Sequence, residues 1–166
     1  MNIIDNLFLG DLNDAKSHEF ISKNSICKII NVTLDVPNYF ENIKYLNIMI
    51  DDSKDVELSI YFEKVFSFIN DDINKNVLIH CRQGKSRSAS FVLAYLLHQY
   101  KMNLISAYNY VKKIRNIVQP NIHFMNQLII YEKKLFDNNS LIIWEYMNKT
   151  KEEYEHFMSF FTIKKN

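Results

Sequence analysis

The sequence predicts an α/β domain with a central mixed β-sheet flanked by helices, and three observations lead to this fold class. First, the β-branched apolar runs at 28–33 and 43–50 are short, and the earlier one ends before the turn residues "DVPN", as strands do. Second, "NVLIH" at 76–80 is typical of a buried strand. Third, strands alternate with helices early in the chain and helices alone follow, as in a sheet covered by helices.

Helical periodicity supports the second half of this prediction. Apolar residues recur at three- and four-residue spacing within 58–73, which predicts an amphipathic helix there; they are Leu58, Phe62, Val65, Phe66 and Ile69. A helix predicted at about 88–100 is apolar nearly all round. Two more are predicted at 104–117 and 122–135, separated by Pro120.

Length and composition limit the classes of protein to consider. At 166 residues the chain is long enough for one domain with its own core. Its two cysteines are too few for a disulfide framework, and "MNIIDNLFLGDL" lacks the features of a secretion signal, so a cytoplasmic or nuclear location is expected. A net charge of +1 gives no global attraction to nucleic acid, and no apolar run approaches the roughly 18 residues of a membrane span. Cys27, in an apolar strand, is expected in the core.

One stretch, "HCRQGKSRS" at 80–88, concentrates residues that are rare elsewhere. It holds one of the two glycines, one of the two cysteines and two of the three arginines. Because it joins a predicted strand to a predicted helix, backbone N–H groups and the positive end of the helix dipole should meet there and form an anion site. Gly84 can adopt backbone angles denied to other residues and lets the main chain approach a phosphate closely.

The same stretch supplies a nucleophile and a phosphate ligand. The N–H groups and Arg87 should favour the Cys81 thiolate, and lowering an ordinary cysteine pKa of about 8.5 by roughly three units corresponds to about 4 kcal/mol. Arg87 offers a planar fork that matches two phosphoryl oxygens, and its use in a chain of 17 lysines and 3 arginines indicates a geometric requirement. The predicted phosphate-binding residues are Arg82, Gln83, Gly84, Lys85, Ser86 and Arg87.

These nine residues resemble the signature loop of the cysteine-dependent protein tyrosine phosphatases: His-Cys, five residues, Arg, then Ser or Thr. Three segments also resemble the dual-specificity phosphatases, particularly the catalytic domains of MAP kinase phosphatases. They are "NVTLDVPNYFENIKYLNIMIDDS", "VLIHCRQGKSRSASFVLAYLL" and "QPNIHFMNQLIIYE". The resemblance runs from about Ile3 to Leu135 and implies a strand, a phosphate-binding loop and a helix at the active site.

The resemblance also implies a mechanism. Such enzymes attack phosphorus with the cysteine thiolate, here Cys81, and hydrolyse the phosphocysteine with water, without a metal or other cofactor. Consistent with this, the histidines show no metal-ligand spacing with Cys or acidic residues. One aspartate protonates the leaving oxygen and later accepts a proton from water. The family position falls on Asp52, and the adjacent Asp51 is the alternative.

Three further residues have implied roles beside simpler structural explanations. Ser88 resembles the hydroxyl that hydrogen-bonds the departing thiolate, or it could be a helix N-cap. His80 resembles a residue that supports the loop through hydrogen bonds. Asn121 resembles one that braces the loop from the next segment, although a Pro-Asn turn would also explain it.

The resemblance implies a phosphatase for phosphotyrosine and phosphoserine or phosphothreonine in proteins, with a protein kinase among the candidate substrates. Arg82 and Lys85 add two positive charges around the pocket, so a phosphoinositide is the second candidate substrate class. RNA is a distant third. A phosphoprotein-binding module without turnover is the alternative from another class, and a sulfurtransferase is disfavoured by the Arg87-Ser88 ending. We expect no nucleic-acid partner, no stable membrane anchor, and a monomer or weak homodimer.

The chain is expected to divide into a catalytic domain at 1–137 and a C-terminal amphipathic helical extension at 138–166 packed on the same domain. After the turn signal "DNNS", Ser140 is a candidate N-cap. Apolar residues then recur at Leu141, Trp144, Met147, Tyr154, Phe157, Met158 and Phe161. Packing on the catalytic domain is favoured over a docking face, because exposed Trp and Phe would promote aggregation.

Overall fold

A five-stranded sheet in the order β1-β2-β5-β3-β4 forms the centre of the computed structural model, which describes residues 1–143 and 145–148. The strands are β1 (Asn2–Ile4), β2 (Leu7–Gly10), β3 (Ile26–Asn31), β4 (Lys44–Asn47) and β5 (Asn76–His80). β1 pairs antiparallel with β2, whereas the other neighbours are parallel. The sheet is therefore mixed, as predicted, and β5 lies in its middle.

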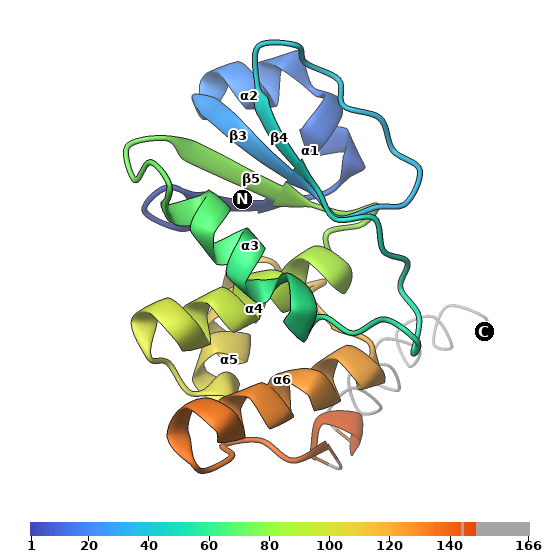
Figure 1. Ribbon diagram of the computed structural model, residues 1–166, viewed down its shortest axis with the longest axis vertical. Coiled ribbons are helices and arrows are strands. Elements are labelled where there is room, and N and C mark those ends of the chain that lie inside the picture. Colours follow the sequence, from blue (N-terminus) through green and yellow to red (C-terminus); the bar gives the residue numbers. More distant parts are fainter. Residues whose placement is uncertain (144, 149–166) are drawn as a thin grey trace, which may run out of the picture.

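Helices cover both faces of the sheet (Figure 1). The helices are α1 (Leu12–Lys16), α2 (His18–Lys23), α3 (Ser59–Asn70), α4 (Arg87–Tyr100), α5 (Leu104–Ile114) and α6 (Ile122–Phe136). β5 shows how one strand serves both layers, because Leu78 joins the small cluster under α1 and α2, while Val77 and Ile79 join the large cluster with α3 to α6. Among the described residues, none of these helices is long and apolar enough to cross a membrane.

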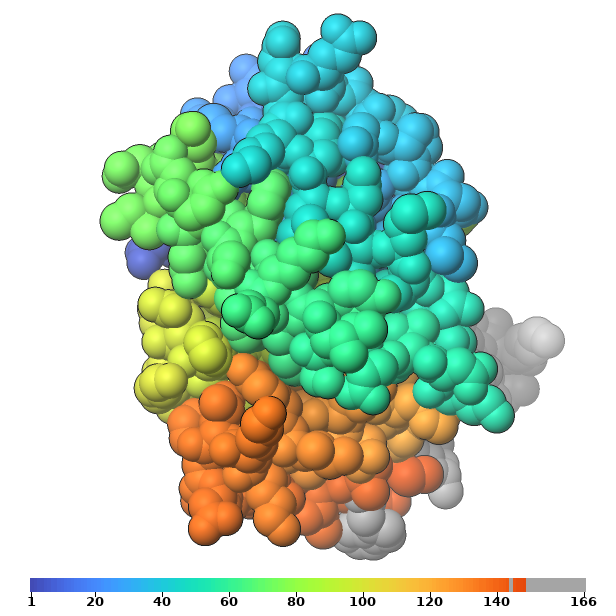
Figure 2. All heavy atoms as spheres, viewed as in Figure 1, coloured from blue at the N-terminus to red at the C-terminus, as the bar shows by residue number. Residues whose placement is uncertain are grey.

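Helix α4 is the central helix of the larger layer. All its residues from Arg87 to Leu97 are buried, because α3, α5 and α6 contact it on different sides. Figure 2 shows the side chains of α3 and α6 meeting on the near surface. Gln127 of α6 joins the two segments, accepting from Leu58 N at 2.7 Å and donating to Val56 O at 2.7 Å. This packing fixes the start of α4, and with it the end of the loop that precedes α4.

The strand boundaries and one core residue differ from the sequence prediction. β3 begins and ends two residues earlier than the predicted 28–33, and β4 covers only the middle of 43–50. Cys27 is exposed, so the prediction that it lies in the core is wrong. The cause is a shift in the pairing of β3 with β5 between Ile26 and Lys28, which turns the intervening side chain outward.

The chain beyond α6 returns to the core. Leu141 and Tyr146 are 4% and 3% exposed and belong to the large hydrophobic cluster. Ser140 does not cap a following helix as predicted: its hydroxyl donates to Glu132 Oε1 (2.6 Å) and accepts from Ile105 N (3.0 Å). A buried carboxylate needs hydrogen-bond donors, and the Ser140 hydroxyl donates to Glu132 instead of capping a helix.

The remaining residues of the predicted apolar face, Trp144, Tyr154, Phe157, Met158 and Phe161, lie outside the described residues. The expectation of a C-terminal amphipathic helical extension at 138–166, packed on the catalytic domain, therefore stays a prediction.

Candidate active site

The loop 81–86 connects the middle strand β5 to the central helix α4, so it begins where parallel strands end and finishes at a helix N-terminus. A pocket of about 680 Å³ opens on it. The lining residues come from the loop and from three other segments: Asp52, then Cys81, Arg82, Gln83, Lys85, Ser86 and Arg87, then Gln119, Pro120, Asn121 and Ile122, and finally Tyr146 and Met147.

All four carbonyl groups from 82 to 85 accept hydrogen bonds from outside the loop. Leu12 N donates to Arg82 O (3.2 Å), Arg115 Nη2 to Gln83 O (2.8 Å), Arg115 Nε to Gly84 O (3.1 Å), and Gln119 N to Lys85 O (2.8 Å). In a planar trans peptide, the next N–H points opposite to the carbonyl. The N–H groups of residues 83–86 are thereby turned inward, toward the side on which Cys81 lies, and form an anion cradle.

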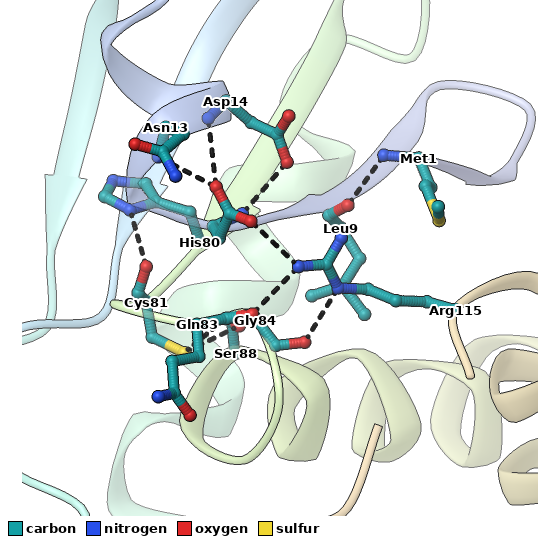
Figure 3. Close-up of polar contacts among 11 residues, drawn as sticks. Met1, Leu9, Asn13, Asp14, His80, Cys81, Gln83, Gly84, Ser88 and Arg115 are labelled. Atoms are coloured by element: carbon teal, nitrogen blue, oxygen red, sulfur yellow. Dashed lines mark hydrogen bonds and ion pairs between the residues drawn. The ribbon is translucent and has the colours of Figure 1, made fainter. Parts of the chain in front are cut away.

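Arg115 is a functional residue that our sequence reasoning missed. It is 7% exposed, and Figure 3 shows its guanidinium beside the backbone of Gln83 and Gly84. Its Nη2 also lies 3.1 Å from Asp11 Oδ2, so a partly buried ion pair holds the fork in place. Its residue type could have indicated a role, because Arg115 is the third arginine of a chain that uses lysine almost everywhere else.

The two glycines of the chain meet behind the loop. Gly84 has φ +64°, and a Cβ there would lie 2.4 Å from Gly10 O, the carbonyl at the end of β2. Gly84 is thus required by both its backbone conformation and its contact with β2. From the sequence we expected Gly84 to let the main chain approach a phosphate closely. In the structure its close contact is instead with Gly10, on the side of the loop away from the pocket.

Cys81 is the only buried cysteine in the described part of the chain, and its sulfur accepts two hydrogen bonds. Gly84 N and Ser88 Oγ each lie 3.2 Å from Sγ. Burial is the largest influence and opposes ionisation. The Ser88 hydroxyl, the nearby Ser88 N–H, the charge of Arg87 and the Gly84 N–H together exceed it and lower the pKa of the Cys81 thiol.

Arg87 has one unsatisfied donor at the pocket. Its side chain is 8% exposed, and Nη1 donates to Ile50 O at 3.1 Å. Its Nε is buried and has no hydrogen-bond partner among the described residues. An unpaired buried donor of a guanidinium costs free energy that a bound phosphoryl oxygen would offset.

Of the two candidate acids, only Asp52 lines this pocket. Its Oδ1 accepts from Ser86 Oγ at 2.7 Å and from Asn121 Nδ2 at 2.6 Å. Asp51 instead accepts from Ser53 Oγ at 2.8 Å and lines a different surface hollow. The two adjacent carboxylates therefore serve different surfaces, and Asp52 is the one that faces the loop.

The three supporting residues are placed as follows. Ser88 is the second residue of α4, and its hydroxyl points to Cys81, so it does not cap the helix. Asn121 contacts the loop, because its backbone N–H donates to Ser86 Oγ at 2.9 Å, and its Oδ1 also caps α6 by accepting from Phe124 N.

His80 supports the loop from below. Its Nδ1 lies 3.4 Å from Cys81 O, and burial lowers its pKa to about 4, so the ring is neutral at pH 7. A neutral ring leaves the positive charge near Cys81 to Arg87 and the helix N-terminus.

The two basic residues at the pocket rim differ. Arg82 Nη2 is paired with Asp35, and both side chains are more than half exposed, so its charge is partly neutralised. Lys85 lines the pocket. Among the described residues, no cluster of three or more His, Cys, Asp or Glu side chains is arranged to hold a metal ion.

The hydrogen bond from Ser88 gives a direct prediction about the Cys81 thiol. Ser88→Ala removes one donor to the thiolate, so the pKa of Cys81 should rise and alkylation by iodoacetamide at pH 6 should slow about tenfold. Peptide mass spectrometry separates Cys81 from exposed Cys27, whose alkylation should not change. Ser67→Ala, on the exposed side of α3, is the control; equal Cys81 rates in both variants would contradict the role of Ser88.

Comparison with known proteins agrees with this geometry. Residues 7–134 match the family described as dual specificity phosphatase, catalytic domain. The chain is 38% identical to human dual specificity protein phosphatase 21 (81% of this chain, 73% of the relative) and 36% identical to human dual specificity protein phosphatase 9 (81% and 36%). The crystal structure of human DUSP28 superposes with a TM-score of 0.76 at 26% identity, over 81% of this chain and 96% of that one. The expected fold and family are confirmed: the chain belongs to the dual specificity protein phosphatases.

Proposed function

We propose that this chain hydrolyses phosphotyrosine and phosphoserine or phosphothreonine in proteins through a phosphocysteine intermediate. One observation carries the proposal: a buried sulfur with two hydrogen-bond donors lies beside an arginine whose Nε has no partner among the described residues. A phosphoryl group bound over Cys81 would occupy the inward-facing N–H groups and this Nε together.

In the first step, the Cys81 thiolate attacks phosphorus, an S–P bond forms and the ester P–O bond breaks. Arg87 and the loop N–H groups stabilise the negative charge on the equatorial oxygens. The leaving oxygen needs a proton, and Asp52 supplies it. Asn121 and Ser86 both bind Oδ1 of Asp52, which leaves Oδ2 for the leaving group.

In the second step, water attacks the phosphocysteine and the S–P bond breaks. Asp52, now a carboxylate, accepts a proton from the water, and inorganic phosphate is released. The thiolate is the leaving group of this step, so the hydrogen bond from Ser88 stabilises it as it departs.

The family supports a phosphorylated protein as the substrate, with protein kinases among the candidates, because the curated relatives are named protein phosphatases. The chain spans less than two thirds of several of these relatives, including 36% of one and 43% of another. A thiolate nucleophile also requires a reducing environment, and neither Cys27 nor Cys81 is in a disulfide. We therefore propose that the substrate is a phosphoprotein of the cytoplasm or nucleus.

Cys81→Ser tests covalent catalysis. The variant should release no measurable phosphate from phosphotyrosine, phosphothreonine or phosphoserine peptides, yet it should still bind them, because the loop N–H groups and Arg87 remain. Phosphate release within tenfold of the wild-type rate would contradict the mechanism. A parallel phosphoinositide panel tests the substrate class, since faster release from these lipids than from every peptide would exclude a protein substrate.

Asp52→Asn tests the acid. Turnover of phosphopeptides should fall by about 10² or more, with a smaller loss for an aryl phosphate whose leaving group needs no proton. Asp51→Asn is the matched control, one residue away and outside the pocket; if it shows this pattern and Asp52→Asn does not, the assignment is off by one residue.

A further inference from the structure

The active-site pocket includes residues beyond the part of the chain that matches the family. The matched residues end at 134, yet Tyr146 and Met147 line the pocket together with Cys81 and Arg87. The family description therefore does not account for one wall of the site. This wall comes from the segment that follows α6.

Buried contacts fix this segment in place. The Glu132 carboxylate, fully buried, accepts from Ser140 N at 2.8 Å and from its hydroxyl at 2.6 Å. Six residues later, Tyr146 OH donates to Pro120 O at 2.5 Å, and its ring meets Tyr108 edge to face with centroids 5.6 Å apart. Such contacts hold the backbone at residue 146, and therefore the start of the next side chain, in one position.

The wall is also coupled to the catalytic groups. Tyr146 anchors to Pro120, and the next residue, Asn121, bonds both Ser86 of the loop and Asp52. The segment and Asp52, the acid that would protonate the leaving oxygen, line the same pocket. A substrate whose phosphoryl group occupies the loop places the rest of its side chain in this pocket.

The chemistry of the wall differs from that of the pocket floor. The floor carries the thiol of Cys81 and the guanidinium of Arg87, whereas Met147 of the wall offers apolar surface, next to that of Pro120 and Ile122 around the start of α6. Met147 is 52% exposed, so a substrate can reach it. Thioether sulfur packs favourably against aromatic rings, and a phosphothreonine side chain has no ring to offer.

We propose that Met147 is a specificity-determining residue that contacts the aromatic ring of phosphotyrosine and favours it over phosphothreonine. This inference rests on the proposed phosphatase function and adds a preference within it. The thioether contacts the ring while the phosphoryl group occupies the loop, so its effect should appear in substrate binding more than in the chemical step.

The test compares one peptide sequence carrying either phosphotyrosine or phosphothreonine. Met147→Ala should lower kcat/KM for the phosphotyrosine peptide about fivefold, mainly through a higher KM, while the phosphothreonine peptide changes less than about twofold. Met147→Leu, which keeps apolar bulk, should recover part of the loss. Ile142→Ala is the matched control, because Ile142 lies on the same segment, is 51% exposed and does not line the pocket.

The outcomes separate this inference from the proposed function. Equal losses on the two peptides, or no loss on either, would overturn the role of Met147 while leaving the phosphatase activity established. The same loss in Ile142→Ala would show a general effect of the segment and also overturn it. If the wild type hydrolysed neither peptide, the proposed function would fail, and this inference with it.

Discussion

The direction of four consecutive carbonyl groups, from Arg82 to Lys85, is the constraint on which the site depends. Loop N–H groups can face an anion only if these carbonyls turn away and find donors elsewhere. The fold supplies those donors from two distant segments, one at Leu12 and one that holds Arg115 and Gln119. Without them, the carbonyl oxygens would be free to turn toward the pocket, where they would repel a phosphate and raise the pKa of the neighbouring thiol.

The sheet topology explains why those donors are available. β2 lies parallel to β5, so both strands end at the same edge of the sheet, and the turn after Gly10 brings Leu12 and Asp11 beside the loop. Asp11 in turn binds Arg115, which arrives from the end of α5. β2 and α5 therefore help to hold the loop, although neither the strand nor the helix lines the pocket. The end of β2 also contacts the loop directly, where Gly10 meets Gly84.

The sequence predicted the parts of the site that are local. The order of strand, loop and helix around Cys81 follows from one contiguous stretch, and Gly84, Arg87 and Ser88 are recognisable at their spacing. Arg115 escaped prediction because its role depends on a contact across 31 residues, to Gly84 O. Cys27 was misplaced for a similar reason: a shift in strand pairing, set by the partner strand β5, turned it outward. The short strands β1 and β2 were missed because three or four residues carry too little periodicity to identify.

Contacts from outside the loop organise the anion cradle. Arg115→Lys should disturb it, because the variant keeps the charge near Asp11 but cannot bond both Gln83 O and Gly84 O with a fixed fork. The affinity for tungstate, an oxyanion that resembles phosphate, should be measured by titration calorimetry. The variant should first be shown to unfold cooperatively, so that it is known to be folded. We expect the variant to bind tungstate about tenfold more weakly than the wild type, because one charge-assisted hydrogen bond is lost. A folded Arg115→Lys protein that binds tungstate as tightly as the wild type would contradict it.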